Sequence, residues 1–585
     1  MTGRAGTTDD ALTNLGLGLL AASAAGLGLL RGAASITAAI TGRPQPDAGL
    51  AGAVAALRRP LEVDDAYGSP GLSAGLYWAV VAAAVAMVGV GAVAVWRMVR
   101  ARPSSVRARL SRLPGGATRS DVTQAASAAA LRRRAAVLRP SVQHPRPADV
   151  GYRIGTSRGQ DVWVTVEDSI LLIGPPRSGK GVNIVISAIL DAPGAVLTTS
   201  TRPDNVTATL RARERSGPVA VFDPERLVPG LPAGLRWSPV RGCDDALTAM
   251  IRAGGLATAT NFSTVTSGDF WQGKTTAALQ ALLHAAALDG RDTATLYRWA
   301  LNPVAAGDAV RILQTNPAAA DGWADSLDAM LSADPRTRDS IWQGVSLAMA
   351  PLADPGVLDA VSPRPGESFD PEAFLRDRGT LYLLATGAGA NASAALVAAF
   401  VEDLTQTARR LAARSPGARL DPPLLLALDE IGNRAPLPSL PTLMADGGGT
   451  GITTMPVLQS MARARENWGD HNAAAIWDSA IVKIILGGGS DSRELQDLSA
   501  LLGERDEHTE SITVERGGGR STQRSVRRMP VMSADMLRML PFGTAVVLLR
   551  TTPPIITRLR PWTSRPDGKQ LARDRAAVEN LLRPS

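Results

Sequence analysis

The longest apolar run in the sequence covers residues 77–96 and contains no charged side chain in twenty positions. Twenty residues of helix cross a hydrocarbon core of about 30 Å, and aromatic residues at both ends, Tyr77 and Trp96, are typical of membrane interfaces. A buried core helix is the alternative interpretation, but the run has no polar face. The pattern therefore predicts a membrane-spanning helix at about 75–97.

A weaker apolar stretch at 14–42 precedes this run and is rich in glycine and alanine. Arg31 interrupts it, and an arginine at the centre of a bilayer costs about 2.5–3.5 kcal/mol on insertion scales. A span over 14–30 would put Arg31 near an interface, where its side chain could reach the headgroups. A signal peptide is the competing interpretation. We favour a first membrane helix at about 14–40, because a second span then returns the chain to its starting side.

Positive charge is distributed unevenly around this hairpin. Arginines cluster directly after the second run, whereas the loop at 43–72 mixes Arg58 and Arg59 with acidic residues. The positive-inside rule places everything after residue 97 in the cytoplasm. We therefore expect a multi-pass protein of the cytoplasmic membrane, with residues 1–100 as an anchor among the inner membrane lipids and a basic juxtamembrane linker at 101–150.

Apolar runs of strand length recur along the rest of the chain, and several are continuously apolar, as strands covered on both faces of a sheet are. Helical patterns lie between them, except at about 241–350, where alanine-rich helical sequence dominates. This order predicts an α/β core interrupted by an all-α insertion. After a β-hairpin near residue 152, strands are expected at 168–173, 194–200, 218–223, 379–386, 423–430, 451–459, 480–488 and 544–550.

The same patterns divide the cytoplasmic part into segments. We expect a first core segment at 151–240, an all-α domain at 241–374, a second core segment at 375–562 and a C-terminal tail at 563–585. The stretch 515–525, ERGGGRSTQRS, is interpreted as a flexible basic linker or the tip of a hairpin, with a nucleic-acid contact as the less favoured alternative.

The loop at 174–181, GPPRSGKG, follows the strand predicted at 168–173 and precedes a helical pattern. Strand, glycine-rich loop and helix form the context that a phosphate-binding loop requires. Its backbone N–H groups would cradle a phosphate chain, and Lys180 would reach the β- and γ-phosphates. Gly181 stands where such loops usually carry the hydroxyl that holds Mg²⁺. The candidate residues are Gly174, Pro175, Pro176, Arg177, Ser178, Gly179, Lys180 and Gly181.

Composition strengthens this interpretation of the loop. Lysine occurs only four times in a chain that otherwise uses arginine for positive charge, and one of the four is Lys180. A compact ammonium suits a phosphate cradle better than the wide planar fork of arginine. The net charge of +8 favours an anionic partner, either nucleic acid or a lipid surface. A single cysteine, Cys243, excludes an intrachain disulfide, and the scattered histidines do not indicate a metal site or a catalytic triad.

An apolar strand that ends in adjacent carboxylates supplies a second half for the site. In LLLALDEIGN, residues 424–433, Asp429 is placed to hold Mg²⁺ and Glu430 to polarise an attacking water as general base. Gln459 ends the next predicted strand, where a polar side chain can orient the water, although an ordinary surface glutamine is equally consistent with the sequence. Together the two halves predict a nucleoside triphosphatase. Arg463, Arg465 and Arg493 are candidates for an arginine supplied by a neighbouring subunit.

Beyond these halves, the chain resembles the type IV coupling proteins of bacterial conjugation, the TraG/TraD group. The resemblance covers most of residues 165–562. It rests on GPPRSGKG (174–181), TTSTRPDN (198–205), VFDP (221–224), LRWSPVRGC (235–243), DFWQGKTTAALQALLHAA (269–286), LALDEIGN (426–433), LQSMARARENWG (458–469) and MLPFGTAVVLL (539–549), in this order behind a two-helix membrane hairpin.

The resemblance implies an α/β fold with a RecA-like P-loop core and an inserted all-α domain that recognises cargo. It implies a homo-hexameric ring with ATP and Mg²⁺ bound between subunits, in which Lys180, Asp429, Glu430 and Gln459 match the family's site residues. Its function would be to bring relaxase-bound single-stranded DNA to the channel of a type IV secretion system. Gly181 matches a variant found in the group.

Two alternatives remain open at this point. A translocase of the FtsK/SpoIIIE type would move double-stranded DNA with a similar motor, although no winged-helix-like C-terminal domain is evident in the sequence. A membrane scaffold that binds a nucleotide and hydrolyses little of it is the third hypothesis, with Gly181 as its distinguishing residue.

Overall fold

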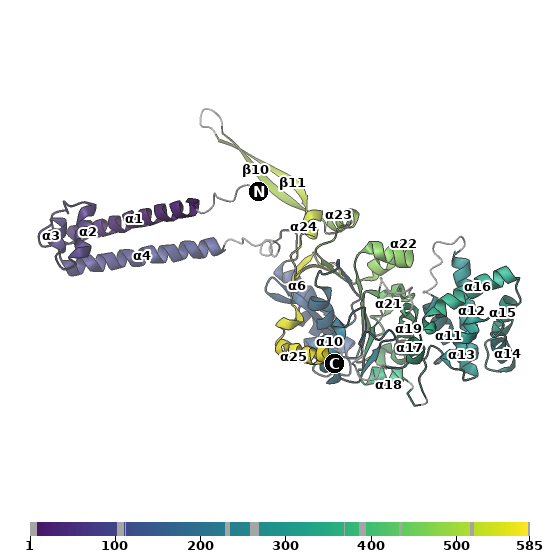
Figure 1. Cartoon of the computed structure of the whole chain (residues 1–585). Helices are drawn as coiled ribbons and strands as arrows, with labels where there is room; N and C mark the ends of the chain where they lie inside the picture. Colours follow the sequence, from purple (N-terminus) through teal and green to yellow (C-terminus); the bar gives the residue numbers. More distant parts are fainter. Residues whose placement is uncertain are drawn as a thin grey trace. The chain divides into compact units, whose positions relative to one another are not determined.

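A computed structural model gives the structure of the protein (Figure 1), which divides into two compact units, Met1–Val106 and Arg107–Ser585. Each unit is described by itself. The structure describes residues 9–101, 110, 113–228, 235–257, 268–364, 366–367, 369–384, 393–431, 436–514 and 520–582. Outside these ranges lie residues 515–519, Asn433 and four of the arginines expected to flank the anchor.

The first unit is a pair of long helices in contact with each other, joined by two short ones. The long helices are α1 (Asp9–Thr41) and α4 (Ala74–Ala101), and the connection contains α2 (Leu50–Arg58) and α3 (Val63–Tyr67). Small and aromatic side chains of all four helices form a buried cluster in which Tyr67 and Tyr77 share a hydrogen bond. The two apolar helices predicted from the sequence are therefore present.

Both long helices contain a stretch that is long and apolar enough to cross a membrane, Ser23–Thr41 in α1 and Ala74–Val93 in α4. The first of these contains Arg31, which the sequence pattern placed at the end of a span. Its guanidinium donates to Ser35 Oγ at 2.5 Å and to the Pro46 carbonyl at 2.6 Å. These two acceptors account for a charged residue inside an otherwise apolar helix, because they satisfy part of its hydrogen-bonding capacity.

Eleven strands form the central sheet of the second unit, in the order β2-β1-β13-β12-β9-β3-β8-β7-β4-β6-β5. Neighbouring strands from β9 to β5 run parallel. These seven strands agree with the positions expected from the apolar runs. They are β3 (Ile170–Ile173), β4 (Val196–Ser200), β5 (Val219–Phe222), β6 (Thr380–Leu384), β7 (Leu424–Asp429), β8 (Ile452–Leu458) and β9 (Val482–Leu486).

Antiparallel strands extend this sheet at one end. They are β1 (Gly151–Ser157), β2 (Gln160–Thr165), β12 (Thr544–Leu549) and β13 (Ile555–Leu559), and β13 has no counterpart among the strands expected from the sequence. Two further strands, β10 (Glu504–Val514) and β11 (Arg520–Pro530), form a separate two-stranded sheet. Since residues 520–525 belong to β11, the structure supports the hairpin interpretation of the stretch 515–525.

Alternate side chains of the central strands enter two different cores. Leu171 and Ile173 of β3 pack in the core that includes α19 (Ala394–Ala413), whereas Ile170 and Leu172 pack with α7 (Ala128–Leu138) and α9 (Ile186–Asp191). A sheet covered on both faces has no solvent-facing side, so its strands are apolar at every position. This explains the uninterrupted sequence ILLI of β3.

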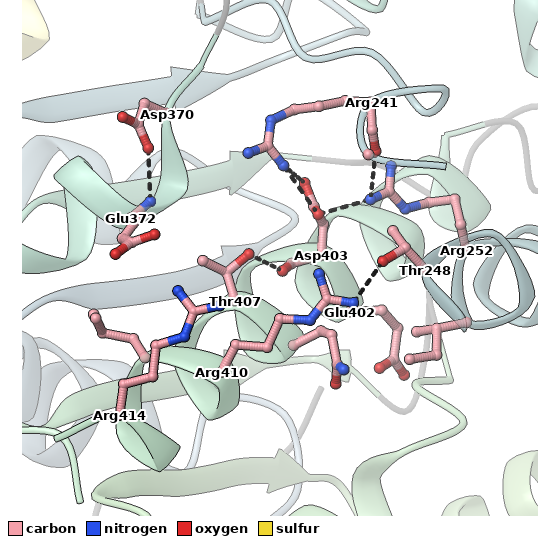
Figure 2. A pocket seen from close by; sticks show the side chains of 14 residues that line it. Arg241, Thr248, Arg252, Asp370, Glu372, Glu402, Asp403, Thr407, Arg410 and Arg414 are labelled. Carbon is pink, nitrogen blue, oxygen red and sulfur yellow. Dashed lines mark hydrogen bonds and ion pairs between the residues drawn. The ribbon is translucent and has the colours of Figure 1, made fainter. Parts of the chain in front are cut away.

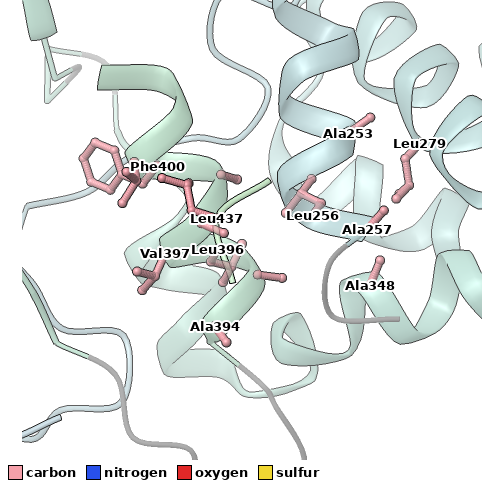
Figure 3. Close-up of a cluster of buried hydrophobic side chains, with 14 of the residues drawn as sticks. Ala253, Leu256, Ala257, Leu279, Ala348, Ala394, Leu396, Val397, Phe400 and Leu437 are labelled. Carbon is pink, nitrogen blue, oxygen red and sulfur yellow. The ribbon is translucent and has the colours of Figure 1, made fainter. Parts of the chain in front are cut away.

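The helical insertion packs on the α/β core through a close crossing of α11 (Ala246–Ala257) with α19. Figure 3 shows Leu256 of α11 on the side of α19, while Ala253 and Ala257 are directed to the side of Leu279. A Cβ added at Gly255 would lie 2.9 Å from the Cα of Ala399, so the two backbones approach as closely as a glycine allows. The insertion continues through α12 (Gly268–Leu288), α13 (Thr293–Leu301), α14 (Gly307–Thr315), α15 (Trp323–Leu331), α16 (Pro335–Met349) and α17 (Pro355–Ala360).

The remaining helices contribute to these cores or pack outside them. The C-terminal helix α25 (Gly568–Leu581) packs on α10 (Asp204–Glu214), with Leu571 and Val578 buried. The others are α6 (Arg119–Ala126), α8 (Pro147–Val150), α18 (Pro371–Arg376), α21 (Leu440–Asp446), α22 (Met461–Ser479), α23 (Ser492–Leu501) and α24 (Ala534–Arg538). The expected fold class, an α/β P-loop core with an all-α insertion behind two apolar helices, is confirmed.

Candidate functional site

The glycine-rich loop starts at the end of β3, in the middle of the sheet. The N–H of Gly174 donates to the carbonyl of Leu458 on the neighbouring strand β8, at 3.1 Å. A Cβ at Gly174 would lie 2.7 Å from Ser178 Oγ and 2.9 Å from Leu486 Cβ, so a side chain there would clash with the loop itself and with β9. The first loop glycine is therefore required by close packing.

Gly179 is required both by its backbone conformation and by close packing. Its φ of +89° lies in the left-handed region that favours glycine, and a Cβ would lie 2.5 Å from Asn183 Nδ2 and 2.7 Å from Phe542 Cε2. The loop therefore turns sharply against its own helix and the Phe542 ring. This compact turn brings successive backbone N–H groups to the start of a helix, which is the arrangement that binds phosphate in other proteins.

Lys180 follows this turn, and its side chain folds back over the loop. Its Nζ donates to the carbonyls of Gly174 at 2.6 Å and Pro175 at 2.9 Å. Burial lowers the pKa of Lys180, while the charges of Asp429 and Glu430 raise it. The lysine therefore lies within electrostatic reach of the acidic pair, as the sequence analysis expects.

The helix after Lys180 begins with a π-helical turn, Gly181–Val185, before α9. Asn183 holds this turn to the loop, because its Nδ2 donates to the Gly179 carbonyl at 3.0 Å. The Oδ1 of Asn183 is buried and has no hydrogen-bond partner among the described residues. Single π-turns inside helices are frequent at functional sites. Asn183 was not among the residues predicted for the site, and its only signal in the sequence is its place one turn after the lysine.

Asp429 and Glu430 lie at the carboxyl end of β7, where two threonines hold them. Thr199 Oγ1 donates to the Asp429 carbonyl at 2.8 Å, and Thr201 Oγ1 donates to the Glu430 carboxylate at 2.6 Å. Both threonines belong to the TTSTRPDN motif, which therefore positions the acidic pair. Glu430 has a φ of +55°, an uncommon backbone conformation that turns the chain directly after the strand.

Burial dominates the electrostatic environment of Asp429. Burial and the charge of Glu430 together raise the pKa of Asp429 to about 6, although Lys180 opposes the shift. A carboxylate in such surroundings gains most from a nearby cation, because a positive charge compensates for the lost hydration. This environment suits Asp429 to the metal-binding role predicted from the sequence.

Strand order brings the predicted residues together. β8 lies between β3 and β7, with Leu458 opposite Ile173 and Val457 opposite Asp429. Gln459 directly follows β8, so it occupies the sheet edge between the loop and the acidic pair. In an open parallel sheet, ligands bind at this carboxyl edge.

The arginines considered as candidates for action on a neighbouring subunit lie on the surface. Arg463 pairs with Glu466 at 2.6 Å on α22, and Arg465 is 4.0 Å from Asp470 on the same helix. Arg493 is exposed in the first turn of α23. Within one chain, none of these contacts selects one arginine over the others.

The site residues fit a phosphate chain with its magnesium ion. The loop has the shape of a cradle that a Cβ at Gly174 or Gly179 would fill, and its lysine and the carboxylate of Asp429 are electrostatically coupled. At Gly181 a Cβ would meet no atom within 4 Å, which leaves room for water in place of the usual hydroxyl. Mg²⁺ commonly takes one or two carboxylates and completes its shell with phosphates and water.

A second polar cluster, not predicted from the sequence, lines a cavity where the insertion meets the α/β core (Figure 2). Arg252 of α11 is buried and pairs with buried Asp403 of α19 at 2.7 Å. Trp237 Nε1 donates to the same carboxylate at 2.9 Å, and its ring lies under the guanidinium. Glu402 is also buried and accepts from the Ser439 N–H at 3.1 Å, and burial raises its pKa. Removing one partner of a buried pair is costly, so this cluster fixes how α11 meets α19.

Comparison with known proteins adds sequence and fold relationships. Residues 423–542 match the family model described as the TraM recognition site of TraD and TraG. No curated protein sequence matches the chain. Among solved structures, the bacterial conjugative coupling protein TrwB in a trigonal form with sulphate is 18% identical, with a TM-score of 0.52, over 74% of this chain and 91% of that one. TrwB bound to a non-hydrolysable ATP analogue is also 18% identical, with a TM-score of 0.50, over 67% and 86% of the two chains. The resemblance to the coupling proteins is confirmed.

Proposed function

We propose, from the premise that this protein shares the fold of a conjugative coupling protein and matches the TraD and TraG family model, that it is a membrane-anchored ATPase that moves DNA. One observation carries the proposal: the lysine of the loop, the acidic pair and Gln459 meet at the carboxyl edge of adjacent parallel strands. TrwB, which has this fold, has been solved with an ATP analogue, and this supports ATP as the nucleotide.

The chain's own residues would divide the work as follows. The loop N–H groups would hold the phosphates, and Lys180 would exchange its two carbonyl acceptors for the β- and γ-phosphate oxygens. Asp429 would hold Mg²⁺, which neutralises the charge that develops on the phosphates. Glu430 would accept a proton from the attacking water once its bond to Thr201 is exchanged for the water. Gln459 would orient that water.

The anchor, the partners and the cargo belong to the same proposal. We infer that α1 and α4 span the cytoplasmic membrane, and that the motor works in the cytoplasm as a ring of six copies with ATP between subunits. Single-stranded DNA with its relaxase would be the cargo, and the channel of a type IV secretion system the destination. The matched family model, named for TraM recognition by TraD and TraG, supports contact with a DNA-processing complex.

ATP turnover by the full chain in detergent, measured with and without DNA, tests this function. We expect single-stranded DNA to stimulate turnover more than duplex DNA does, and the stimulation to fall steeply with salt, because phosphate contacts release counterions. Stronger stimulation by duplex DNA would favour a translocase of the FtsK/SpoIIIE type. Absence of turnover with either DNA, at a retained ATP affinity, would favour the nucleotide-binding scaffold.

A further inference from the structure

The hairpin formed by β10 and β11 stands off the motor as an isolated ribbon (Figure 1). Each strand has 11 residues, and they pair in register from Glu504 opposite Pro530 to Val514 opposite Arg520. The described side chains along its length, at 506–508 and 524–528, are exposed. The ribbon therefore has two faces and two edges outside the core of its own chain.

Among the described residues, the ribbon is fixed to the rest of its unit at its base. Leu502 and Val531, at the two ends of the hairpin, pack in a buried cluster with Leu498, Leu537 and Leu540. Beyond this base, no third strand of the described residues pairs with either edge. A two-stranded hairpin is at best marginally stable in water, and exposed strand edges readily pair with another chain. A partner strand at either edge would therefore stabilise the ribbon.

Charge is separated between the two strands of the ribbon. In register, Asp506 lies opposite Arg528, Glu507 opposite Arg527 and Glu510 opposite Arg524. β10 thus carries mostly acidic side chains along its edge of the ribbon, apart from Arg505, and β11 carries basic ones along the other edge. The acidic edge would repel both nucleic acid and an anionic membrane, but it complements the basic edge of a second copy, because opposite charges on adjacent strands stabilise their pairing.

We propose that the outer edge of β10 in one copy pairs with the outer edge of β11 in the next copy around the ring. Hairpins that point the same way around an axis alternate in strand direction, so each new contact is antiparallel, as within the ribbon. A head-to-tail contact of this kind closes into a ring when the rotation allows. The ribbons then form an up-and-down barrel with two strands from each copy, in which no edge remains.

This pairing rests on the subunit ring of the proposed function and adds the surface that joins its members. Its acid–arginine pattern permits a specific test by exchanging the charges of the two strands. In the exchanged chain, Asp506, Glu507 and Glu510 become Arg, and Arg524, Arg527 and Arg528 become Glu. Each of the three cross-strand pairs keeps opposite charges, and the net charge of the chain is unchanged.

We expect the exchanged chain alone to assemble as the wild type does in detergent, measured by analytical ultracentrifugation. In mixtures, wild-type β11 would meet an equally basic β10 of the exchanged chain, so we expect mixed assemblies at less than about one tenth of the statistical share, which corresponds to about 1.4 kcal/mol. Differently tagged chains and pull-down measure this share. Reversing β11 alone should dissociate the assembly, and adding the β10 reversal should restore it.

Free mixing of the two chains in an assembly would overturn the edge pairing and leave the ring of the proposed function intact. A wild-type chain that stays monomeric with ATP and DNA would overturn both. A cross-link gives an independent readout: His508→Cys chains mixed with Val526→Cys chains should join through a short bismaleimide, and neither variant alone should. Cys243 does not interfere, because it is buried and its pKa is raised to about 11.

Discussion

Gly181 leaves the position after the loop lysine without a side chain, although the structure has room for one. Because a Cβ there meets no atom within 4 Å, Gly181→Ser should fold normally and restore a hydroxyl beside the magnesium site. One added polar contact of about 1 kcal/mol corresponds to a roughly fivefold lower Mg²⁺ concentration for half-maximal ATP turnover. A titration of ATP turnover with Mg²⁺ measures this half-maximal concentration.

Gly181→Ala is the matched control for this substitution, since it adds the same Cβ and no hydroxyl. It should leave the Mg²⁺ requirement unchanged while sharing any gain in helix propensity. If serine and alanine behave alike, the hydroxyl position does not face the metal, and Asp429 with water and phosphates is the complete set of ligands.

Glu402 provides a pH dependence at the scale of one residue. Burial raises the pKa of Glu402 above the usual value of about 4.3. The neutral form of Glu402 therefore stabilises the folded protein below that pH, and this stabilisation is lost as the pH rises through the pKa in the folded state. Glutamine mimics the neutral acid and can keep the bond to the Ser439 N–H. Glu402→Gln should therefore raise the unfolding temperature at pH 8 and have little effect near pH 4.

The exposed Glu466→Gln is the control for charge removal as such, and thermal unfolding at both pH values is the measurement. A Glu402→Gln variant that is less stable than wild type at pH 8 would show that the charged form is the stabilising one in this cavity.

At the scale of elements, the crossing of α11 with α19 depends on one glycine of an adjacent pair. Gly255→Ala would place its Cβ 2.9 Å from Ala399 Cα, while a Cβ at Gly254 meets no atom within 4 Å. Overpacking of this kind costs about 1–3 kcal/mol, whereas alanine in an open helical position gains up to about 1 kcal/mol. The free energies of unfolding of the two variants, measured by chemical denaturation, should change in opposite directions relative to wild type. Equal changes would mean that the two helices do not cross this closely.

The sequence predicts most of the strands and loops that carry the site, but few of the contacts between their side chains. The parallel strands were predictable because burial on both faces makes each an apolar run. β13 was not, because IITRL is short and includes an exposed Arg558, and β10 and β11 were not, because polar strands lack the alternation that marks a half-buried strand. The bond from Thr201 to Glu430 depends on β4 lying beside β7, a strand order that no local pattern encodes.

At the scale of the whole molecule, membrane orientation can be tested with two matched exposed positions. Leu61, between α2 and α3, is 86% exposed, and Val304 of the helical insertion is 84% exposed. An impermeant maleimide added to intact spheroplasts should label Leu61→Cys and should label Val304→Cys only after lysis. Cys243 should stay unlabelled in the native protein, because burial raises the pKa of its thiol. Labelling of Val304→Cys in intact spheroplasts would show that the helical insertion lies outside the cytoplasm, which contradicts the proposed orientation.

The molecule thus combines an apolar helical pair, a motor with its site at one sheet edge, and a charged ribbon suited to pairing between copies. The sheet of the second unit carries the loop on β3 and the acidic pair on β7, and the ribbon lies between β9 and β12 along the chain. This arrangement gives every copy the same site and the same pair of edges, as a ring requires.

The most direct test of the account is the separation of ATP binding from ATP hydrolysis at the two halves of the site. Glu430→Gln should bind ATP as wild type does and lose turnover about 100-fold or more, because the general base is removed while the loop is intact. Lys180→Ala should lose both, because the ammonium contributes to binding itself. If Glu430→Gln turns over ATP at the wild-type rate, the acidic pair is not the catalytic half of this site, and the motor proposed here is contradicted.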